Sequence, residues 1–253
     1  MRFRNERISY GFEERCNLEK RDNVISALAL LENETRLSFY EASDNPEINI
    51  ACSKLPPESK NEGHFIAGEG GPTEIINGSA YAIILFGKIS LYRNETCDNP
   101  NIALHEILHV LGFDHNDNPL SILYPTLDCK QKLDDYMIDE IERVYSAQTL
   151  PDLTINKIEG NKSGKYASFE IVIENMGLAD AVNSSVSLFA DGRFVRDFAL
   201  DTIPLGARKI LTVSNINIGR RTEALSFEVD ANNRITELQE DNNVRNLELT
   251  ATS

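Results

Sequence analysis

The sequence contains no tryptophan and little histidine, methionine or positive charge. Its 253 residues include four histidines and three methionines, and 25 Lys and Arg stand against 40 Asp and Glu, for a net charge of −15. A protein that binds nucleic acid needs a basic surface to neutralise phosphates, so this composition excludes nucleic acid as the principal partner. An apolar run of the ~20 residues needed to cross a bilayer is also missing, so no membrane-spanning helix is expected.

The first residues lack the features of a targeting segment. The stretch from Met1 to Arg7 carries three arginines and no apolar core of a secretory signal. Two interpretations remain: an intracellular protein, or an exported one whose signal or anchor segment is absent from this chain. Hydrophobic residues make up 41% of the sequence, which is enough for packed cores. The length is typical of two domains.

Three of the four histidines lie in one eleven-residue stretch, His105 to His115, which reads H-E-x-x-H-x-x-G-x-x-H. Apolar residues separate the first two, and no Pro or Gly interrupts residues 102–111, so this part is predicted to be a buried helix. Residues four apart share one helical face, so His105 and His109 can bind the same zinc ion. Gly112 permits a left-handed turn that ends the helix, and His115 is predicted to return from the loop as the third ligand.

Three protein ligands leave one position of a tetrahedral zinc open, which is typical of a catalytic site. Glu106 follows His105 directly and is predicted to face the same cleft, where it can act as general base on a zinc-activated water. The alternative is a buried helix with incidental histidines. The glycine and the third histidine, beyond the bare H-E-x-x-H core, favour one catalytic Zn²⁺ and hydrolytic chemistry.

This stretch resembles the long zinc motif of the metzincin metallopeptidases, and the match continues beyond it. Residues Ser121 to Pro125 read S-I-L-Y-P and resemble the turn beneath the zinc in the matrixin branch, whose usual form is Ser/Ala-x-Met-Tyr-Pro. Leu123 takes the methionine position. Leucine is similar in volume and apolarity, so the exchange should cost under about 1.5 kcal/mol. The resemblance implies an apolar floor at Leu123 and a wall of the specificity pocket at Tyr124 and Pro125.

All four cysteines lie in the first 150 residues: Cys16, Cys52, Cys97 and Cys129. None has C-x-x-C spacing, so a cysteine zinc site or a redox motif is not expected. Cys97 and Cys129 flank the zinc motif, and a bridge between them would close a ring around it, with Cys16 then paired to Cys52. Connectivity cannot be deduced from sequence alone, and four reduced core thiols are the alternative. Two bridges would indicate an oxidising, extracellular setting.

Residues 1–149 are expected to form the metallopeptidase domain, for which the resemblance implies an α+β fold with a twisted mixed sheet and three helices. Strands are predicted at 7–14, 37–42, 48–52, 81–86 and 89–93, and helices at 20–32, 102–111 and 136–145. Gly87 is predicted to lie in a turn between the last two strands, and Asn99 and Asn101 to cap the zinc helix. The Gly- and Pro-rich stretch 54–78 is predicted to be a loop. Its His64 is interpreted as an ordinary loop residue rather than a ligand of a second zinc.

The composition changes after Thr149, and residues 150–253 contain neither cysteine nor histidine. Seven short strands are predicted, at 152–158, 167–175, 184–190, 193–199, 207–214, 224–230 and 243–249. Their number and turn signals favour an immunoglobulin-like all-β sandwich. The region also resembles the CARDB domain of prokaryotic surface proteins, through motifs such as Pro151-Asp152-Leu153 and Glu240-Asp241-Asn242-Asn243.

Several polar side chains of this second domain carry the hard oxygen atoms that calcium prefers. They are Asp230, Asn232, Glu237, Glu240 and Asn242. A polar hairpin whose Asx side chains bond their own backbone explains them better. Calcium is therefore not predicted.

The sequence predicts a secreted or cell-surface zinc endopeptidase that hydrolyses peptide bonds of extracellular proteins, acting as a monomer. Its sandwich domain is expected to tether the enzyme or to dock a cell-surface partner. In matrixins the free edge of a strand before the zinc helix accepts the substrate peptide, a role that would fall within residues 75–93. The alternative is a surface adhesion or peptide-binding protein whose zinc site is inactive or structural. Leu123 favours that alternative, and the intact Glu106 disfavours it.

Overall fold

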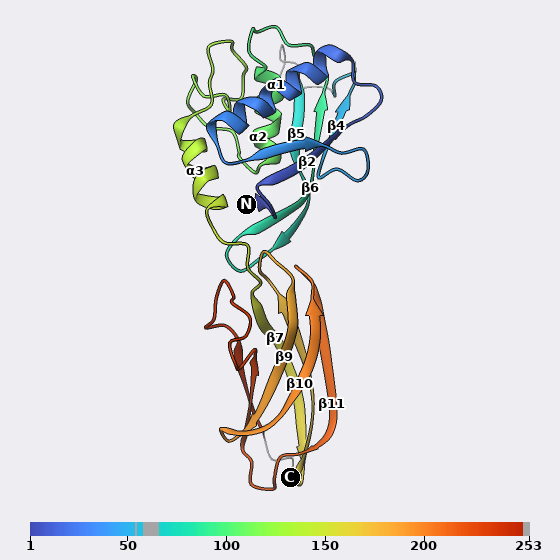
Figure 1. The fold of residues 1–253 in the computed structure, drawn as a ribbon, viewed down its shortest axis with the longest axis vertical. Coiled ribbons are helices and arrows are strands. Elements are labelled where there is room, and N and C mark those ends of the chain that lie inside the picture. The colour runs from blue at the N-terminus through green and yellow to red at the C-terminus, as the bar shows by residue number, and fades with distance from the viewer. Residues whose placement is uncertain (54, 58–65, 250–253) are drawn as a thin grey trace. The chain divides into compact units, whose positions relative to one another are not determined.

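A computed structural model describes residues 1–53, 55–57 and 66–249 of the chain, which fold into two compact units (Figure 1). The first unit comprises Met1–Ile76 and Tyr81–Ala147, and the second comprises Asn77–Ala80 and Gln148–Ser253. His64, for which the sequence analysis considered a ligand role, lies outside the described residues. None of the described helices is long and apolar enough to cross a membrane.

The first unit is built on one sheet, whose described strands run in the order β1-β6-β4-β2-β3, with β5 paired to β6. The strands are β1 (Arg2–Phe3), β2 (Arg7–Phe12), β3 (Ser38–Glu41), β4 (Ile48–Cys52), β5 (Gly68–Asn77) and β6 (Ala82–Leu91). The pairs β1–β6, β6–β4, β4–β2 and β2–β3 are parallel. Only four residues join β5 to β6, and so short a connection requires antiparallel pairing. The predicted mixed sheet is confirmed.

The three predicted helices are also confirmed, as α1 (Leu18–Glu34), α2 (Asn101–Val110) and α3 (Asp135–Tyr145). Figure 1 shows α1 and α2 lying across the sheet, with α3 to one side of them. One continuous apolar core joins sheet and helices. Its fully buried members include Ile8, Ile50 and Ile89 from the sheet, Val24 and Leu31 from α1, and Ile107 and Leu108 from α2. The zinc motif is therefore carried by a helix that is embedded in the core.

The stretch 54–78 was predicted to be a loop; its residues 54 and 58–65 lie outside the described part of the chain. Residues Gly68–Asn77 form strand β5 instead. Its glycines are required by close packing rather than by a turn, because a Cβ atom at Gly70 would lie 2.2 Å from the Glu106 backbone oxygen. A Cβ at Gly68 would lie 2.7 Å from the Glu106 carboxylate. Glycine inside a strand often marks such a close approach.

Gly87 was predicted to lie in a turn, but β6 runs without interruption from Ala82 to Leu91. A Cβ at Gly87 would lie 2.4 Å from Val110 Cγ1, so this glycine allows α2 to pack directly on the sheet. The predicted asparagine caps of α2 are also wrong. The first helical residue follows Pro100 without a side-chain cap, and the Ile102 amide donates to Glu95 Oε2 at 2.8 Å.

Strand β1 was not predicted, because two residues carry no periodic signal. It pairs with β6 at Ile83 and Ile84. Arg2 is buried, and its Nη1 donates to the Val144 carbonyl at 2.9 Å near the end of α3. The Phe3 amide donates to the Tyr145 hydroxyl at 2.9 Å. These bonds fasten α3 to the sheet.

In the second unit, the seven predicted strands are confirmed and form two antiparallel sheets. The strands are β7 (Leu153–Ser163), β8 (Tyr166–Asn175), β9 (Ala181–Ala190), β10 (Arg193–Ile203), β11 (Arg208–Asn217), β12 (Ala224–Val229) and β13 (Val244–Glu248). One described sheet has the order β10-β9-β12-β13 and the other β11-β8-β7. Buried side chains such as Phe169 and Phe227, with ring centroids 4.7 Å apart, fill the space between them.

The polar residues considered for calcium bond largely to the protein itself. Asp230 Oδ2 accepts the amide proton of Ile235 at 2.7 Å. The Glu237 carboxylate accepts from the Leu153 amide and from Asn243 Nδ2. The Asp230 bond is local, as in the preferred hairpin, whereas Glu237 bonds to Leu153 on β7, a residue distant in the sequence. Within the described residues, the one group of three or more His, Cys, Asp or Glu side chains close enough to share a metal ion is the histidine group of the zinc motif.

Candidate metal centre and active site

The loop that follows α2 turns the third histidine of the motif back towards the first two. Gly112 has φ +95°, the positive value predicted for the end of the helix. Its amide donates to the His109 carbonyl at 3.0 Å, and the Phe113 amide donates to the Leu108 carbonyl at 3.1 Å. The chain then reverses and brings His115 over the helix face that carries His105 and His109.

The Nε2 atoms of the three histidines converge. His105 and His109 Nε2 lie 3.0 Å apart, and each lies 3.2 Å from His115 Nε2. The three side chains differ in exposure: His105 is buried, His109 is half-buried and His115 is exposed. The group is therefore anchored in the core at one side and open to solvent at the other.

Backbone carbonyls fix the tautomers of two of these rings. His105 Nδ1 lies 2.6 Å from the Ile122 oxygen, and His109 Nδ1 lies 2.7 Å from the Phe113 oxygen. A carbonyl oxygen only accepts, so each Nδ1 carries the proton and donates it. Each Nε2 then directs a lone pair towards the common centre. Neutral imidazoles held in this way by outer hydrogen bonds suit Zn²⁺, and the residues present therefore fit the metal that the motif implies.

Glu106 is buried, with 4% of its surface exposed, and lies on the side of α2 that faces β5. At 3.6 residues per turn it is displaced by about 60° around the helix axis from His109. Its carboxylate occupies the space that a side chain at position 68 would need. Burial, reinforced by the charge of Glu69, raises the pKa of the Glu106 carboxyl to about 8 in the metal-free protein. A carboxyl with that pKa exchanges its proton near neutral pH.

Burial has the opposite effect on the neighbouring imidazoles. It lowers the pKa of His105 from 6.5 to about 4, assisted by repulsion from His109 and His115. The pKa of His115 is lowered too, by partial desolvation of its otherwise exposed ring and then by His109. A neutral ring is the form that binds metal, so both shifts keep the site competent for metal at mildly acidic pH.

In the metal-free protein, a Glu106→Gln variant is expected to be more stable than wild type at pH 8, with the difference vanishing near pH 4.5. Between these values the folded chain keeps a proton that the unfolded chain has released, so Glu106 costs stability as the pH rises. At about 1.4 kcal/mol per pH unit across this window, the difference at pH 8 is on the order of 5 kcal/mol. Denaturant unfolding in the presence of a chelator measures it.

His105 acts in the opposite sense between pH 4 and 6.5, where the unfolded chain binds a proton that the folded chain does not. This contribution is common to both proteins and cancels in the comparison. A stability difference that did not change between pH 4.5 and 8 would contradict the proposed burial of the Glu106 carboxyl.

The turn Ser121–Pro125 lies next to the histidine group and is tied to it. The carbonyl of Ile122 accepts from His105, and the Asn116 amide, next to His115, donates to the Leu123 carbonyl at 3.0 Å. Leu123 is 1% exposed and belongs to the apolar core, as a floor residue would. Tyr124 is half-buried and Pro125 is exposed.

Both disulfides considered in the sequence analysis are present, Cys16–Cys52 and Cys97–Cys129. The second closes a ring that contains all three histidines and the turn. Asn101, at the start of α2, also donates through Nδ2 to the Asp128 carbonyl at 3.0 Å. The two ends of the ring are thus held together by a covalent bond and by a hydrogen bond.

Replacing Gly70 by alanine is expected to lower the free energy of unfolding by about 1–3 kcal/mol and to reduce any activity of the site. The new Cβ would lie 2.2 Å from the Glu106 carbonyl oxygen, so β5 must move away from α2. Gly71→Ala is the matched control, because a Cβ there meets no atom within 4 Å. Urea unfolding of both variants measures the effect. Equal free energies of unfolding for the two variants would show that β5 is not closely packed against α2 at Gly70.

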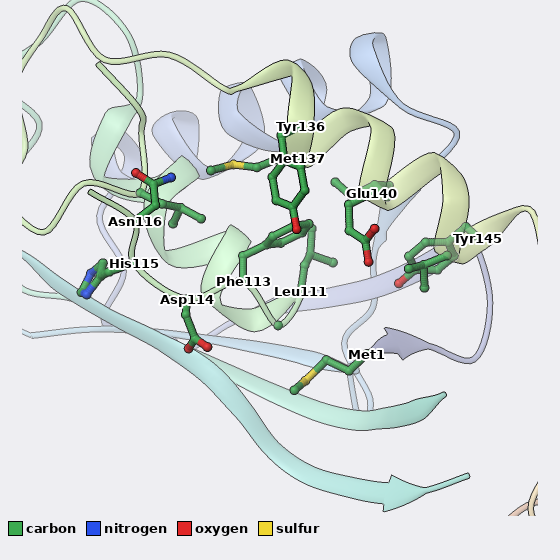
Figure 2. Close-up of a pocket in the computed structure, with 14 residues that line it drawn as sticks. Met1, Leu111, Phe113, Asp114, His115, Asn116, Tyr136, Met137, Glu140 and Tyr145 are labelled. Atoms are coloured by element: carbon green, nitrogen blue, oxygen red, sulfur yellow. The ribbon is translucent and has the colours of Figure 1, made fainter. Parts of the chain in front are cut away.

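A pocket of about 380 Å³ lies beside the histidine group (Figure 2). Figure 2 shows Tyr136, Met137 and Glu140 on α3, with Phe113 and His115 on the loop after α2. His105, Glu106 and His109 are not part of its lining. Of the three histidines, only His115 lines this pocket. The pocket is therefore separate from Glu106 and from the side of α2 that faces β5.

Sequence reasoning missed the surroundings of Glu106. Gly68 and Gly70 contact it from β5, and Glu69 between them accepts a hydrogen bond from the Tyr92 hydroxyl at 2.6 Å. The one local signal was the run of glycines ahead of Ile75 and Ile76, which can mark close backbone approach as well as a loop.

Comparison with known proteins divides the chain in the same way as the fold. The Matrixin family model matches residues 2–146, and the CARDB family model matches residues 150–247. No curated protein sequence matches the chain.

Solved structures are similar to each part. The CARDB domain of a Pyrococcus furiosus protein, solved in complex with di-metal ions, is 24% identical, with a TM-score of 0.35, 41% of this chain and 96% of that chain covered. A domain of a putative cell surface protein from Methanosarcina acetivorans is 20% identical, with a TM-score of 0.36 and coverages of 40% and 94%. High choriolytic enzyme 1, a hatching enzyme zinc-protease from the medaka Oryzias latipes, is 14% identical, with a TM-score of 0.34 and coverages of 57% and 92%.

Proposed function

Because this chain belongs to the matrixin family of metalloproteases, with a CARDB domain after it, we propose that it is an active zinc-dependent endopeptidase. The observation that carries the proposal is the convergence of three Nε2 atoms within 3.2 Å of one another, each on a ring that can be neutral. His105, His109 and His115 would hold the metal. Exposed His115 leaves the site open to substrate.

When bound, zinc supplies Lewis acidity that polarises the scissile carbonyl and makes a water molecule more acidic. Glu106 accepts the proton of the attacking water and then donates it to the leaving amine. Its burial suits both steps, because a carboxylate held out of solvent can accept the water proton as a base and then return it as an acid. Leu123 supports the histidines from below, and Tyr124 and Pro125 form a wall of the pocket for the substrate side chain.

Strand β5 is where we place the substrate peptide. In the described part of the sheet β5 pairs with β6 alone, which leaves its other edge for an added strand. Gly68 and Gly70 bring that strand into contact with Glu106, so a peptide on its edge passes close to the base. This assigns the role to residues 68–77 rather than to the range 75–93 that the sequence suggested.

The two disulfides and the CARDB domain favour an extracellular or cell-surface location, because disulfides persist in oxidising compartments. The substrates are then extracellular proteins or peptides. The CARDB domain tethers the enzyme or binds a surface partner.

Digestion of a fluorescent peptide library tests the proposal. The purified chain is expected to bind one zinc ion per molecule and to cleave peptides. Activity should be lost on treatment with a chelator and return when zinc is added. Stoichiometric zinc without cleavage of any peptide would instead support the alternative of an adhesion or peptide-binding protein. Cleavage that persists after complete zinc removal would reject the metal mechanism.

A further inference from the structure

Glu69 belongs to the strand that contacts the proposed general base, and the mechanism above gives it no role. It lies in β5 between the two glycines that contact Glu106. Glu69 is nevertheless exposed, whereas Glu106 is buried.

The alternation of side chains along a strand fixes where Glu69 points. A side chain at position 68 or 70 would point towards α2. Side chains alternate along a strand, so Glu69 lies on the opposite, outer face of the sheet. Strand β6 has the same alternation, because Ile89 and Leu91 are buried in the core. Tyr92, the next residue after Leu91, lies on the outer side and donates its hydroxyl proton to Glu69 Oε2 at 2.6 Å.

This hydrogen bond fixes Glu69 Oε2 on the outer face of β5. Gly71, the next residue of β5 on the same face, has no side chain. A peptide that pairs with this part of β5 therefore meets the charge of Glu69 on the outer face. Residues paired across two strands project to the same face, with Cβ atoms about 4.5–5.5 Å apart.

We propose that Glu69 selects substrates that carry lysine or arginine at the outward-facing position paired with it on β5. The inference rests on the proposed endopeptidase function and on substrate addition to this edge. Opposite charges paired across strands stabilise each other modestly, so the preference for lysine over glutamine at that position is about two- to five-fold in kcat/KM. Glutamate at the same position should be disfavoured by a similar factor.

The test uses the zinc-loaded full chain and one peptide that it cleaves, synthesised with lysine, glutamine or glutamate in turn at each position within four residues of the scissile bond. Wild type is expected to prefer lysine at one position. Glu69→Gln should abolish the preference, and Glu69→Lys should reverse it in favour of glutamate. Tyr92→Phe, which removes the hydrogen bond, should weaken it. Raising the ionic strength should reduce the preference of wild type, because the pair is exposed.

Glu74→Gln is the matched control. Glu74 is also exposed on β5 and has the same charge, but it lies five residues further on, about 17 Å along the strand. This variant should keep the wild-type preference. A preference that survives Glu69→Gln, or no lysine preference at any position, overturns the inference. A uniform loss of activity on all peptides in Glu69→Gln also overturns it, because that result indicates a positioning role.

The two proposals fail in different ways. If the zinc-loaded wild type cleaves no peptide, the endopeptidase function is rejected and the selectivity falls with it. If the wild type cleaves peptides but Glu69 has no effect on the choice among them, only the selectivity is rejected.

Discussion

Replacing Glu106 by glutamine is expected to lower kcat for peptide cleavage by about 10²–10⁴-fold, which is the usual contribution of a general acid–base group. Glutamine has nearly the same shape and fits against Gly68 in the same way, but it cannot accept the proton of the attacking water. The zinc content should be unchanged, because the three imidazoles are held by carbonyls of Ile122 and Phe113 and by the loop, independently of Glu106. Single-turnover kinetics with a cleaved peptide measures the loss.

Two comparisons make this result specific. Glu14→Gln removes the same charge from an exposed position outside β5 and the histidine ring and should leave kcat unchanged. A His115→Ala variant should lose zinc as well as activity, which separates metal binding from proton transfer. If Glu106→Gln kept wild-type kcat with zinc bound, Glu106 would not be the base.

Removing the Cys97–Cys129 bridge with a double serine variant is expected to lower the free energy of unfolding by roughly 3–4 kcal/mol. The bridge closes a loop with a sequence separation of 32, and the loss reflects the greater freedom of the unfolded chain without it. The same ring holds α2, His115 and the turn Ser121–Pro125, so zinc affinity should fall too. Denaturant unfolding and zinc titration against a competing chelator measure the two effects.

The Cys16–Cys52 bridge provides the control. It closes a loop of similar size, with a separation of 36, but lies outside the histidine ring. Its removal should cost at least as much stability, since both of these cysteines are buried, and should leave zinc affinity nearly unchanged. Equal losses of zinc affinity in the two double variants would show that the histidine ring has no special part in holding the metal.

The features that the sequence predicted well are those with a local, periodic or strongly spaced signal. The spacing of His105, His109 and His115 predicted three converging rings, because one helical turn and one glycine reversal determine where they lie. Alternating apolar residues placed all seven strands of the second unit, because each strand has one face in a core. The cysteines allowed two interpretations, and only the arrangement of the chain in space decided between them.

The features that it predicted badly depend on contacts between distant segments. Glycine at 68, 70 and 87 indicated loops and turns by composition, whereas each lies in a strand and makes room for α2. The amide of Ile102 is capped by Glu95 rather than by the nearby asparagines, because the preceding loop folds back over the helix end. Glu69 and Tyr92 lie 23 residues apart and are neighbours only once β5 and β6 have paired.

The contact between the β5 glycines and Glu106 would also couple peptide binding to the position of the general base. The strand that would bind the peptide is also the strand that packs against Glu106 and buries its carboxyl group. Tightening of β5 by a well-paired peptide would press on α2 at Glu106, whereas a peptide that interrupts the pairing, for example with proline, would leave the base less constrained. Peptide affinity and kcat would then change together, so a weakly bound substrate would also be cleaved slowly.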